Sequence, residues 1–200
     1  MKAKAGDIGT NWSARSLVLF GPFAAVMFLA ADRVGAAMTP GYSSWAQAIS
    51  ELMETGAPAK HVVDPLLIAY HGSVIPFAIG LHRATRSLAR SWLAPALLSG
   101  AGLAGVILTA IFPCDPGCEP MVSLRGTLHI LIAIPMGFSI LVAIYLFSRR
   151  FRGSAGWRYC RIYSLLTFWS TLALAILTVA VAETVYVGVA ERFLTYGYLQ

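Results

Sequence analysis

The chain has 200 residues, of which 58% are hydrophobic and 12% are charged, and its formal net charge at pH 7 is +6. Soluble domains are about 45–50% apolar and about 25% charged, so this composition excludes an ordinary soluble domain and predicts a membrane protein. Six crossings of about 20 residues each would use roughly 120 residues. We therefore expect a single domain over residues 1–200, with no room for a separate catalytic or nucleotide-binding domain.

Five long apolar runs follow one another along the chain, and a weaker sixth follows Glu191. The five runs cover residues 16–31, 62–81, 94–112, 127–147 and 162–182. They are apolar on every side, so their natural surrounding is lipid. We predict an all-α, polytopic transmembrane helical bundle with five full crossings and a short or incomplete sixth. In the third run, Ala96, Gly100 and Ala104 form a small-residue stripe that favours close packing with another helix.

The basic residues predict how the bundle is oriented. Eleven of the fifteen Lys and Arg residues fall at the N-terminus and in the loops after the second and fourth runs. Because Lys and Arg in short loops stay in the cytoplasm, we predict a multi-pass protein of the cell membrane with a cytoplasmic N-terminus. As an alternative, the first run is a secretory signal, since Lys2, Lys4 and Arg15 precede a short apolar core.

The same charge pattern indicates the partners. The basic loops suit anionic membrane lipid, and they lack the interleaved aromatic residues that stack on bases, so we expect lipid contact and no nucleic acid. Eight of the nine acidic residues lie on the opposite, outer side. The carboxylates therefore collect at the outer face.

The first outer loop, residues 32–61, is the longest polar stretch. Within it, residues 44–54 place Trp45, Ile49 and Leu52 on one side. This pattern predicts a short amphipathic helix that lies along the membrane interface and covers the mouth of the bundle.

Several short motifs, in chain order, carry a resemblance to a known family. They are Pro40-Gly41-Tyr42-Ser43, Ile49-Ser50-Glu51-Leu52, Phe112-Pro113 with Asp115-Pro116, His129 with Ala133, Trp157 with Tyr163-Ser164, and Glu191-Arg192. The chain resembles the domain of unknown function 998 (DUF998) family of prokaryotic multi-pass membrane proteins over nearly its whole length. The resemblance implies a six-crossing helical protein and brings no established reaction.

Two features depart from that family. Members usually continue well past the Glu191-Arg192 pair, whereas here only residues 193–200 follow. These are too few to cross about 30 Å of hydrocarbon at about 1.5 Å per residue, so we expect an incomplete sixth crossing. Cys114 stands where members more often carry a small hydroxyl residue.

Ionisable residues from distant parts of the chain converge near the outer boundary of the predicted bundle. Glu51 lies in the first loop, Asp115 follows the third run, and His129 begins the fourth. A histidine beside a carboxylate can act as a general acid or base. The candidate catalytic set is therefore His129 oriented by Asp115, with Glu51 assisting and Ser50 or a bound water as nucleophile.

Further polar residues are candidate ligand-binding groups. They are Glu183, Glu191, Arg192, Arg125 and His71. For those at helix ends, the alternative is that they cap the backbone or face headgroups, and Glu191 and Arg192 could simply pair. Asp32, Glu54 and Glu119 are expected to be solvated.

His71 differs from the other candidates because it falls near the middle of the second run. An ionisable group inside the membrane is a functional hypothesis by default. It would serve as a proton relay or a ligand contact. The alternative is a neutral imidazole that hydrogen-bonds to Ser139 or Ser170 of a neighbouring helix.

Cys114 and Cys118 lie on the predicted outer side, where thiols are often oxidised. A disulfide between them is the leading hypothesis. Zinc bound by both cysteines, His129 and a carboxylate is the alternative, although the spacing is weak for a metal site. We expect no metal or other cofactor.

Three classes of function remain open. The first is a module whose outer-face polar pocket binds a lipid-like or hydrophobic small molecule or a membrane protein partner. The second is a membrane-embedded enzyme that performs acid–base or hydrolytic chemistry on a lipid-like substrate through His129, Asp115 and Glu51. The third, a transporter, is disfavoured because the crossings hold almost no charge and show no repeated pair of broken helices.

Overall fold

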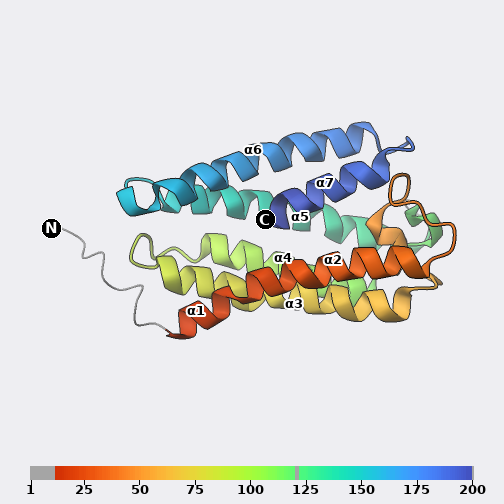
Figure 1. Ribbon diagram of the computed structural model, residues 1–200, viewed down its shortest axis with the longest axis horizontal. Helices are drawn as coiled ribbons and strands as arrows, with labels where there is room; N and C mark the ends of the chain where they lie inside the picture. Colours follow the sequence, from red (N-terminus) through yellow and green to blue (C-terminus); the bar gives the residue numbers. More distant parts are fainter. Residues whose placement is uncertain (1–11, 120–121, 200) are drawn as a thin grey trace.

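The computed structural model describes residues 12–119 and 122–199, and over these residues the regular structure is helical throughout (Figure 1). The α-helices are α1 (Trp12–Val18), α2 (Phe20–Met38), α3 (Lys60–Thr85), α4 (Leu93–Ile111), α5 (Leu124–Arg150), α6 (Arg158–Ala180) and α7 (Val187–Leu199). The 3-10 helices are η1 (Ile49–Met53), η2 (Pro116–Cys118) and η3 (Ala155–Trp157). The prediction of an all-α bundle is confirmed.

Five segments are long and apolar enough to cross a membrane. They are Ala14–Met38, Lys60–Thr85, Leu93–Ile111, Leu124–Arg150 and Ala155–Ala180. The predicted five crossings are thereby confirmed. The 13 residues of α7 extend only about 20 Å at about 1.5 Å per residue, so α7 is too short to span the hydrocarbon.

The helices pack as a row that curls back on itself. Each of α3 to α7 lies against the helix before it, starting from α2. The row closes because Tyr196 of α7 packs edge-on against Phe28 of α2, with ring centroids 6.2 Å apart. In Figure 1, α1 to α4 form one group and α5 to α7 the other, and the end of α7 lies about midway along the bundle.

The two ends of the bundle differ in composition. At one end, which we name the cap end, lie the first loop (residues 39–59), η2 and the beginnings of α3, α5 and α7. At the other, the basic end, lie the α3–α4 loop (residues 86–92) and the α5–α6 loop (residues 151–157). The predicted grouping of the loops is therefore found in the fold.

The tightest packing is near the cap end. One buried cluster joins α2, η1 and α3, and its members include Phe28, Leu52, Val63, Leu67 and Tyr70. Leu52 and Val63 have no exposed surface at all. The first loop is therefore anchored in the bundle core.

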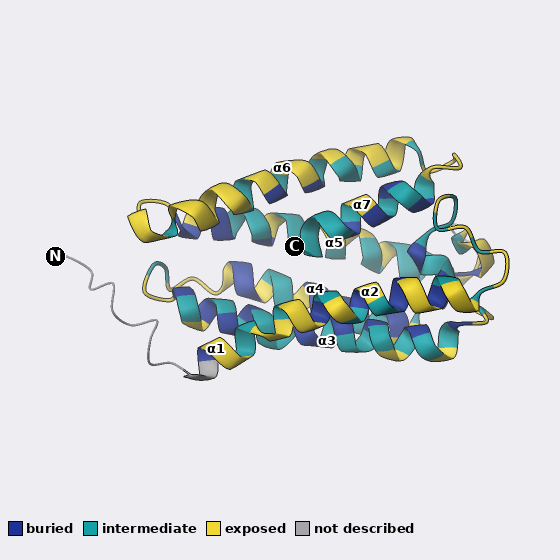
Figure 2. Cartoon of the chain, viewed as in Figure 1, coloured by how far each residue is buried: buried dark blue, intermediate teal, exposed yellow. Residues whose placement is uncertain are grey.

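Figure 2 shows that the outward face of α6 is largely exposed, and both α5 and α6 carry exposed apolar side chains. Leu131, Phe138, Leu166, Trp169 and Ile176 all have more than half of their surface exposed. Large apolar side chains on an outer surface mean that their surrounding is itself apolar. These two helices therefore contact membrane lipid.

The helix expected over residues 44–54 is much shorter than predicted, because only η1 forms there. The carbonyl groups of Ser44 and Gln47 are used instead as acceptors for Arg192 of α7. These contacts favour a turn conformation for residues 44–47, linked to α7, over a local helix. Trp45, which is 57% exposed, packs its ring against Tyr186 just before α7.

Candidate functional site

The centre of the cap end is a buried ion pair between α2 and α7. The Nη2 and Nε atoms of Arg192 donate to Oδ1 of Asp32 at 2.8 and 3.1 Å. The Asp32 side chain has no exposed surface, and Arg192 is 5% exposed. The expectation that Asp32 is solvated is therefore wrong. α2 runs past the predicted end of the first apolar run and buries Asp32 against α7.

Other polar groups complete the bonding of this pair. Nη1 of Arg192 donates to the carbonyls of Ser44, Gln47 and Gly188 at 2.7, 2.9 and 3.0 Å. The Tyr42 hydroxyl accepts from Nη2 of Arg192 at 2.7 Å and donates to the Ala48 carbonyl at 2.8 Å. The guanidinium is thus bonded on every side, as a buried charge requires.

Two tyrosines respond to this environment. Burial raises the pKa of Tyr42 to about 12, and the hydrogen bond from Arg192 opposes that rise. Tyr196 of α7 donates its hydroxyl proton to Oδ2 of Asp32. Both hydroxyls therefore stay protonated and serve as hydrogen-bond donors to the cluster.

Glu191, a predicted ligand-binding residue, and Glu51, a predicted catalytic residue, both accept hydrogen bonds from the first loop. Glu191 accepts from the backbone N–H of Ile49 at 2.7 Å. Glu51 accepts from the backbone N–H of Ala48 at 2.8 Å and from Nε2 of Gln47 at 2.7 Å. Burial raises the pKa of Glu191 to about 7, against the lowering effects of its backbone hydrogen bond and of the Arg192 charge. The Glu191 bond therefore holds the loop to α7, whereas the Glu51 bonds fix the loop's own conformation.

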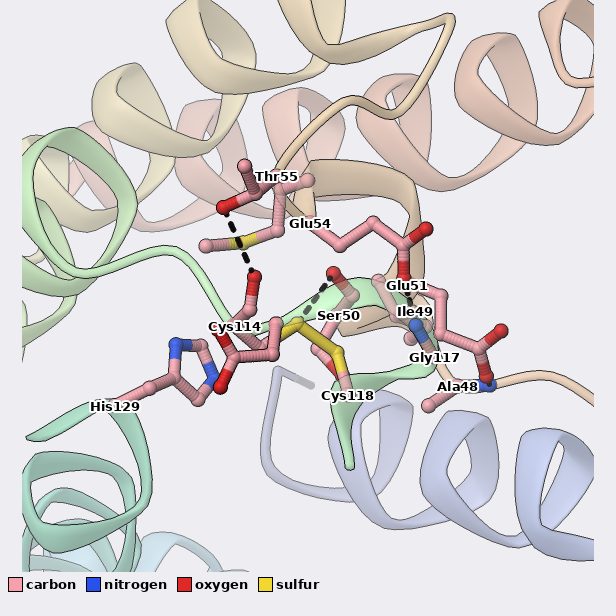
Figure 3. The surroundings of a disulfide bond; sticks show 12 residues. Ala48, Ile49, Ser50, Glu51, Glu54, Thr55, Cys114, Gly117, Cys118 and His129 are labelled. Carbon is pink, nitrogen blue, oxygen red and sulfur yellow. Dashed lines mark hydrogen bonds between the residues drawn. A yellow bond between two sulfur atoms is a disulfide. The ribbon is translucent and has the colours of Figure 1, made fainter. Parts of the chain in front are cut away.

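The α4–α5 loop is tied to the first loop around a disulfide (Figure 3). Cys114 and Cys118 are bonded to each other, so neither sulfur is a thiolate that could hold zinc. The Cys114 carbonyl accepts from the backbone N–H of Thr55 at 3.1 Å and from its hydroxyl at 3.3 Å. Glu54 accepts from the backbone N–H of Gly117, and burial raises the pKa of this glutamate.

No metal centre is present among the residues that the structure describes, since no group of three His, Cys, Asp or Glu side chains could hold an ion.

His129 and Asp115 lie at the same end of the bundle but bind different partners. Nδ1 of His129 lies 2.8 Å from the Phe112 carbonyl, and Figure 3 shows its ring beside the loop that carries Cys114. Asp115 accepts from the backbone N–H of Ser123 at 2.9 Å and from its hydroxyl at 2.7 Å. Asp115 thereby supports Ser123, the N-cap residue of α5.

The remaining sequence candidates are scattered. Ser50 lies in η1, where its carbonyl is 3.5 Å from the Cys114 sulfur. Glu183 and Arg125 are exposed and lie outside the bonded cluster. Glu51, Glu191 and Arg192 therefore take part in the hydrogen bonds of the cap end, whereas the side chains of Ser50, Glu183 and Arg125 do not.

His71 lies inside the bundle, where α3 meets α4. A Cβ on Gly105 of α4 would overlap the His71 ring, so the absence of a side chain at Gly105 makes room for the imidazole. The predicted serine partners are engaged elsewhere: Ser139 donates to the Pro135 carbonyl at 2.8 Å, and Ser170 donates to a carbonyl of its own helix at 3.1 Å. His71 is also one of the residues that line a cavity.

That cavity has a volume of about 590 Å³ and lies in the half of the bundle nearer the basic end. Its walls come from α1 to α6, with Ala25, Val74, Ala143 and Ser164 among the lining residues. Tyr198, near the end of α7, lines the cavity from the side of the cap end. The cavity therefore lies between the C-terminal end of α7 and the basic end of the bundle.

A model of the family described as protein of unknown function (DUF998) matches residues 22–199. This chain belongs to the DUF998 family. The match runs from α2 to α7, so it includes Asp32, Arg192 and most of the residues around the cavity. The comparisons with curated proteins and with solved structures gave no match.

Two features of this DUF998 protein were missed by sequence reasoning. A signal for Asp32 was present, because an aspartate directly after the apolar run is costly at membrane depth unless it is paired. Arg192 was a candidate, but its partner is 160 residues away. The cavity left no signal, since its lining is as apolar as the rest of the helices.

Proposed function

We propose that this DUF998 protein is a membrane-embedded binding module that takes the hydrophobic part of a lipid-like molecule between its two helix groups. The observation that carries the proposal is the cavity of about 590 Å³ between the C-terminal end of α7 and the basic end. Ligand sites of about 300–1,000 Å³ with mainly apolar walls and a few polar groups are typical of small-molecule binding. This cavity fits that description.

The position of the cavity favours a ligand that arrives through the membrane. Between α2 and α6 the cap-end half is filled by α7, whereas the basic-end half holds the cavity. Ala25 and Ser164 are only partly buried on either side of it, and Tyr163 is 49% exposed. An acyl chain can therefore reach the cavity sideways from the bilayer, without passing through water.

The lining limits the chemistry of the ligand. Its polar groups are few, and they include the His71 imidazole and the hydroxyls of Ser164 and Thr167. Ser164 already donates to the Cys160 carbonyl at 2.8 Å. Such a site suits a hydrocarbon chain with at most one or two polar atoms and disfavours a free ion or a sugar.

The cap end supports the binding module over the enzyme. Glu51, Asp115 and His129 each hold a backbone or a serine in place. A general acid or base must reach the proton that it transfers, and these groups bind structural partners instead. The cap end is therefore assigned the role of joining α7 to the bundle.

The proposal is tested by photolabelling in vesicles. The protein is reconstituted with phosphatidylglycerol that carries a photoreactive diazirine in its acyl chain, and labelled peptides are identified by mass spectrometry. We expect labels on cavity-facing positions of α2 and α6. Ser164→Phe, which places a ring in the cavity, should strongly reduce this labelling.

Ser170→Phe is the matched control, because Ser170 lies on the same helix and is exposed on its surface. It should leave the labelling of the cavity unchanged. Equal labelling of the cavity in Ser164→Phe and in the unmodified protein would contradict the proposal. Co-purification of a second membrane protein that protects the cavity from the probe would also contradict it, in favour of a protein partner.

A further inference from the structure

A second hollow lies at the basic end, outside the bundle interior. It has a volume of about 680 Å³ and is formed by the last turn of α3 and the α3–α4 loop. Its lining includes His82, Arg86, Arg90 and Trp92. These residues are close in sequence, so one short segment builds the whole hollow.

The charge in and around this hollow is of one sign. Arg86 and Arg90 are exposed, and neither forms an ion pair with any residue in the described part of the chain. No carboxylate lines the hollow. Arg150 of α5 lies next to the same loop, where it donates to the Thr85 hydroxyl at 2.7 Å and to the Ser91 carbonyl. Two arginines therefore line the hollow and a third lies beside its loop, and no carboxylate lines it.

A buried histidine supplies the second observation. His82 is 6% exposed, and its ring stacks on Trp92 with centroids 3.6 Å apart. Its Nδ1 atom is buried and has no hydrogen-bond partner. A buried polar atom without a partner destabilises the fold, and native structures rarely keep one unless something else satisfies it.

We propose that this hollow binds a phosphate group, with the N–H at Nδ1 of His82 donating to one phosphate oxygen and Arg86 and Arg90 pairing with the others. Arginine suits phosphate because its planar fork donates two parallel hydrogen bonds. The phosphate can come from an anionic lipid headgroup or from a free phosphate in solution. The site is separate from the apolar cavity and does not depend on the proposed function.

The experiment compares the two sources. The intact protein is placed in nanodiscs, and its association with spin-labelled phosphatidylglycerol and with spin-labelled phosphatidylcholine is measured by electron paramagnetic resonance. Binding of inorganic phosphate to the protein in neutral detergent is measured by calorimetry. A preference for phosphatidylglycerol that inorganic phosphate does not abolish supports the lipid source. Calorimetric binding together with loss of that preference supports free phosphate.

Variants of Arg90 and His82 test the proposed contacts with phosphate, and a variant of Arg83 is the control. Arg90→Gln should weaken phosphate binding by about three- to fivefold, as expected for a partly exposed charge pair. Arg83→Gln is the matched control, since Arg83 is exposed in the last turn of α3, at the same end of the bundle, and does not line the hollow. Equal losses in both variants would overturn the proposal, because a diffuse attraction between the basic end and anions would then explain the binding.

His82→Phe separates the role of Nδ1 from a purely structural role. Phenylalanine keeps the stacking on Trp92 and removes the atom that lacks a partner. We expect this variant to melt at a higher temperature without phosphate and to bind phosphate more weakly. A lower melting temperature with unchanged binding would overturn the assignment. Absence of both phosphate binding and lipid preference in the unmodified protein would overturn the site itself.

Discussion

The cap end and the basic end differ in whether their polar groups have partners within the protein. At the cap end, Asp32 and Arg192 are buried together and their hydrogen bonds are completed by Tyr42, Tyr196 and backbone carbonyls. At the basic end, arginines gather without carboxylates and His82 keeps a buried atom with no partner. Polar groups that are satisfied within the protein stabilise it, and the phosphate proposed above would supply partners for the groups left unsatisfied at the basic end.

This difference distinguishes the residues that hold the bundle together from the residues that we propose bind ligands. The residues with the strongest chemistry in the sequence, such as Glu51, Asp115 and His129, lie at the cap end and hold loops in place. The sites that remain open are the apolar cavity and the hollow at the basic end. Substitutions at the cap end should therefore change stability, and substitutions at the basic end should change binding.

The largest effect is expected for the buried ion pair. Arg192→Leu leaves Asp32 buried without its partner, which typically costs about 3–5 kcal/mol of unfolding free energy. The loss is measured by chemical unfolding in detergent. Arg33→Gln is the control, because the Arg33 side chain is 68% exposed and lies 3.8 Å from the same carboxylate. It should change stability by less than about 1 kcal/mol.

A double variant sharpens this test. Asp32→Leu combined with Arg192→Leu removes both charges, so no charge is left uncompensated, and much of the lost stability should return. A double variant as unstable as Arg192→Leu would contradict the explanation by ion pairing. The packing of α7 against α2 would then be the main source of stability.

The crossings were predictable because each depends on about 20 consecutive apolar residues, a property local to the sequence. The Asp32–Arg192 pair was not predictable in this way, since its members lie 160 residues apart and meet only when the row of helices curls. The loop helix was overestimated for a related reason. Its backbone binds α7, and this competition is invisible in the local pattern of residues 44–54.

The second prediction concerns helix packing along α4. Gly102→Ala would place a Cβ 2.7 Å from the backbone carbonyl of His71 and 3.1 Å from Cβ of Val74, and backbone cannot move aside easily. Overpacking of this kind costs about 1–3 kcal/mol. Gly100→Ala has nothing within 4 Å and should stabilise the helix by up to about 1 kcal/mol. Thermal unfolding of the two variants measures the contrast.

The contrast between Gly102→Ala and Gly100→Ala tests whether the spacing of small residues identifies the packed face of a helix. The stripe of Ala96, Gly100 and Ala104 indicated a contact face, yet Ala96 and Gly100 are exposed and the buried glycines are Gly102 and Gly105. Small residues occur on several faces of α4, so spacing alone could not select the one that packs. Equal destabilisation by Gly100→Ala would instead indicate that the predicted stripe packs against another helix.

The third prediction tests the disulfide at the cap end. Serine in place of both Cys114 and Cys118 removes a bridge between residues four positions apart. For so short a loop the entropic contribution is about 2 kcal/mol. Unfolding free energies with and without reductant should differ by this amount in the unmodified protein and should not differ in the variant. Rapid thiol labelling of both cysteines without reductant would contradict the bridge.

The smallest effect concerns pH. Because the pKa of Glu191 is raised from 4.5 to about 7 by burial, folding favours its protonated form. The stability that this provides is present in full below about pH 4.5 and is lost as the pH rises through about 7. The charges that act on Glu191 are those of Arg192, which favours ionisation, and of Glu51 and Asp32, which oppose it.

Glu191→Gln keeps an acceptor for the Ile49 N–H and removes the titration. Relative to the unmodified protein, the variant should therefore gain stability between pH 5 and pH 8, as measured by melting temperatures across that interval. Glu183→Gln, at an exposed carboxylate in the turn before α7, should leave the pH profile unchanged. An unchanged profile in Glu191→Gln as well would contradict this prediction. The Glu191 carboxylate would then be ionised throughout the interval from pH 5 to pH 8, and α7 would contact the first loop through a charged group, as in a surface salt bridge.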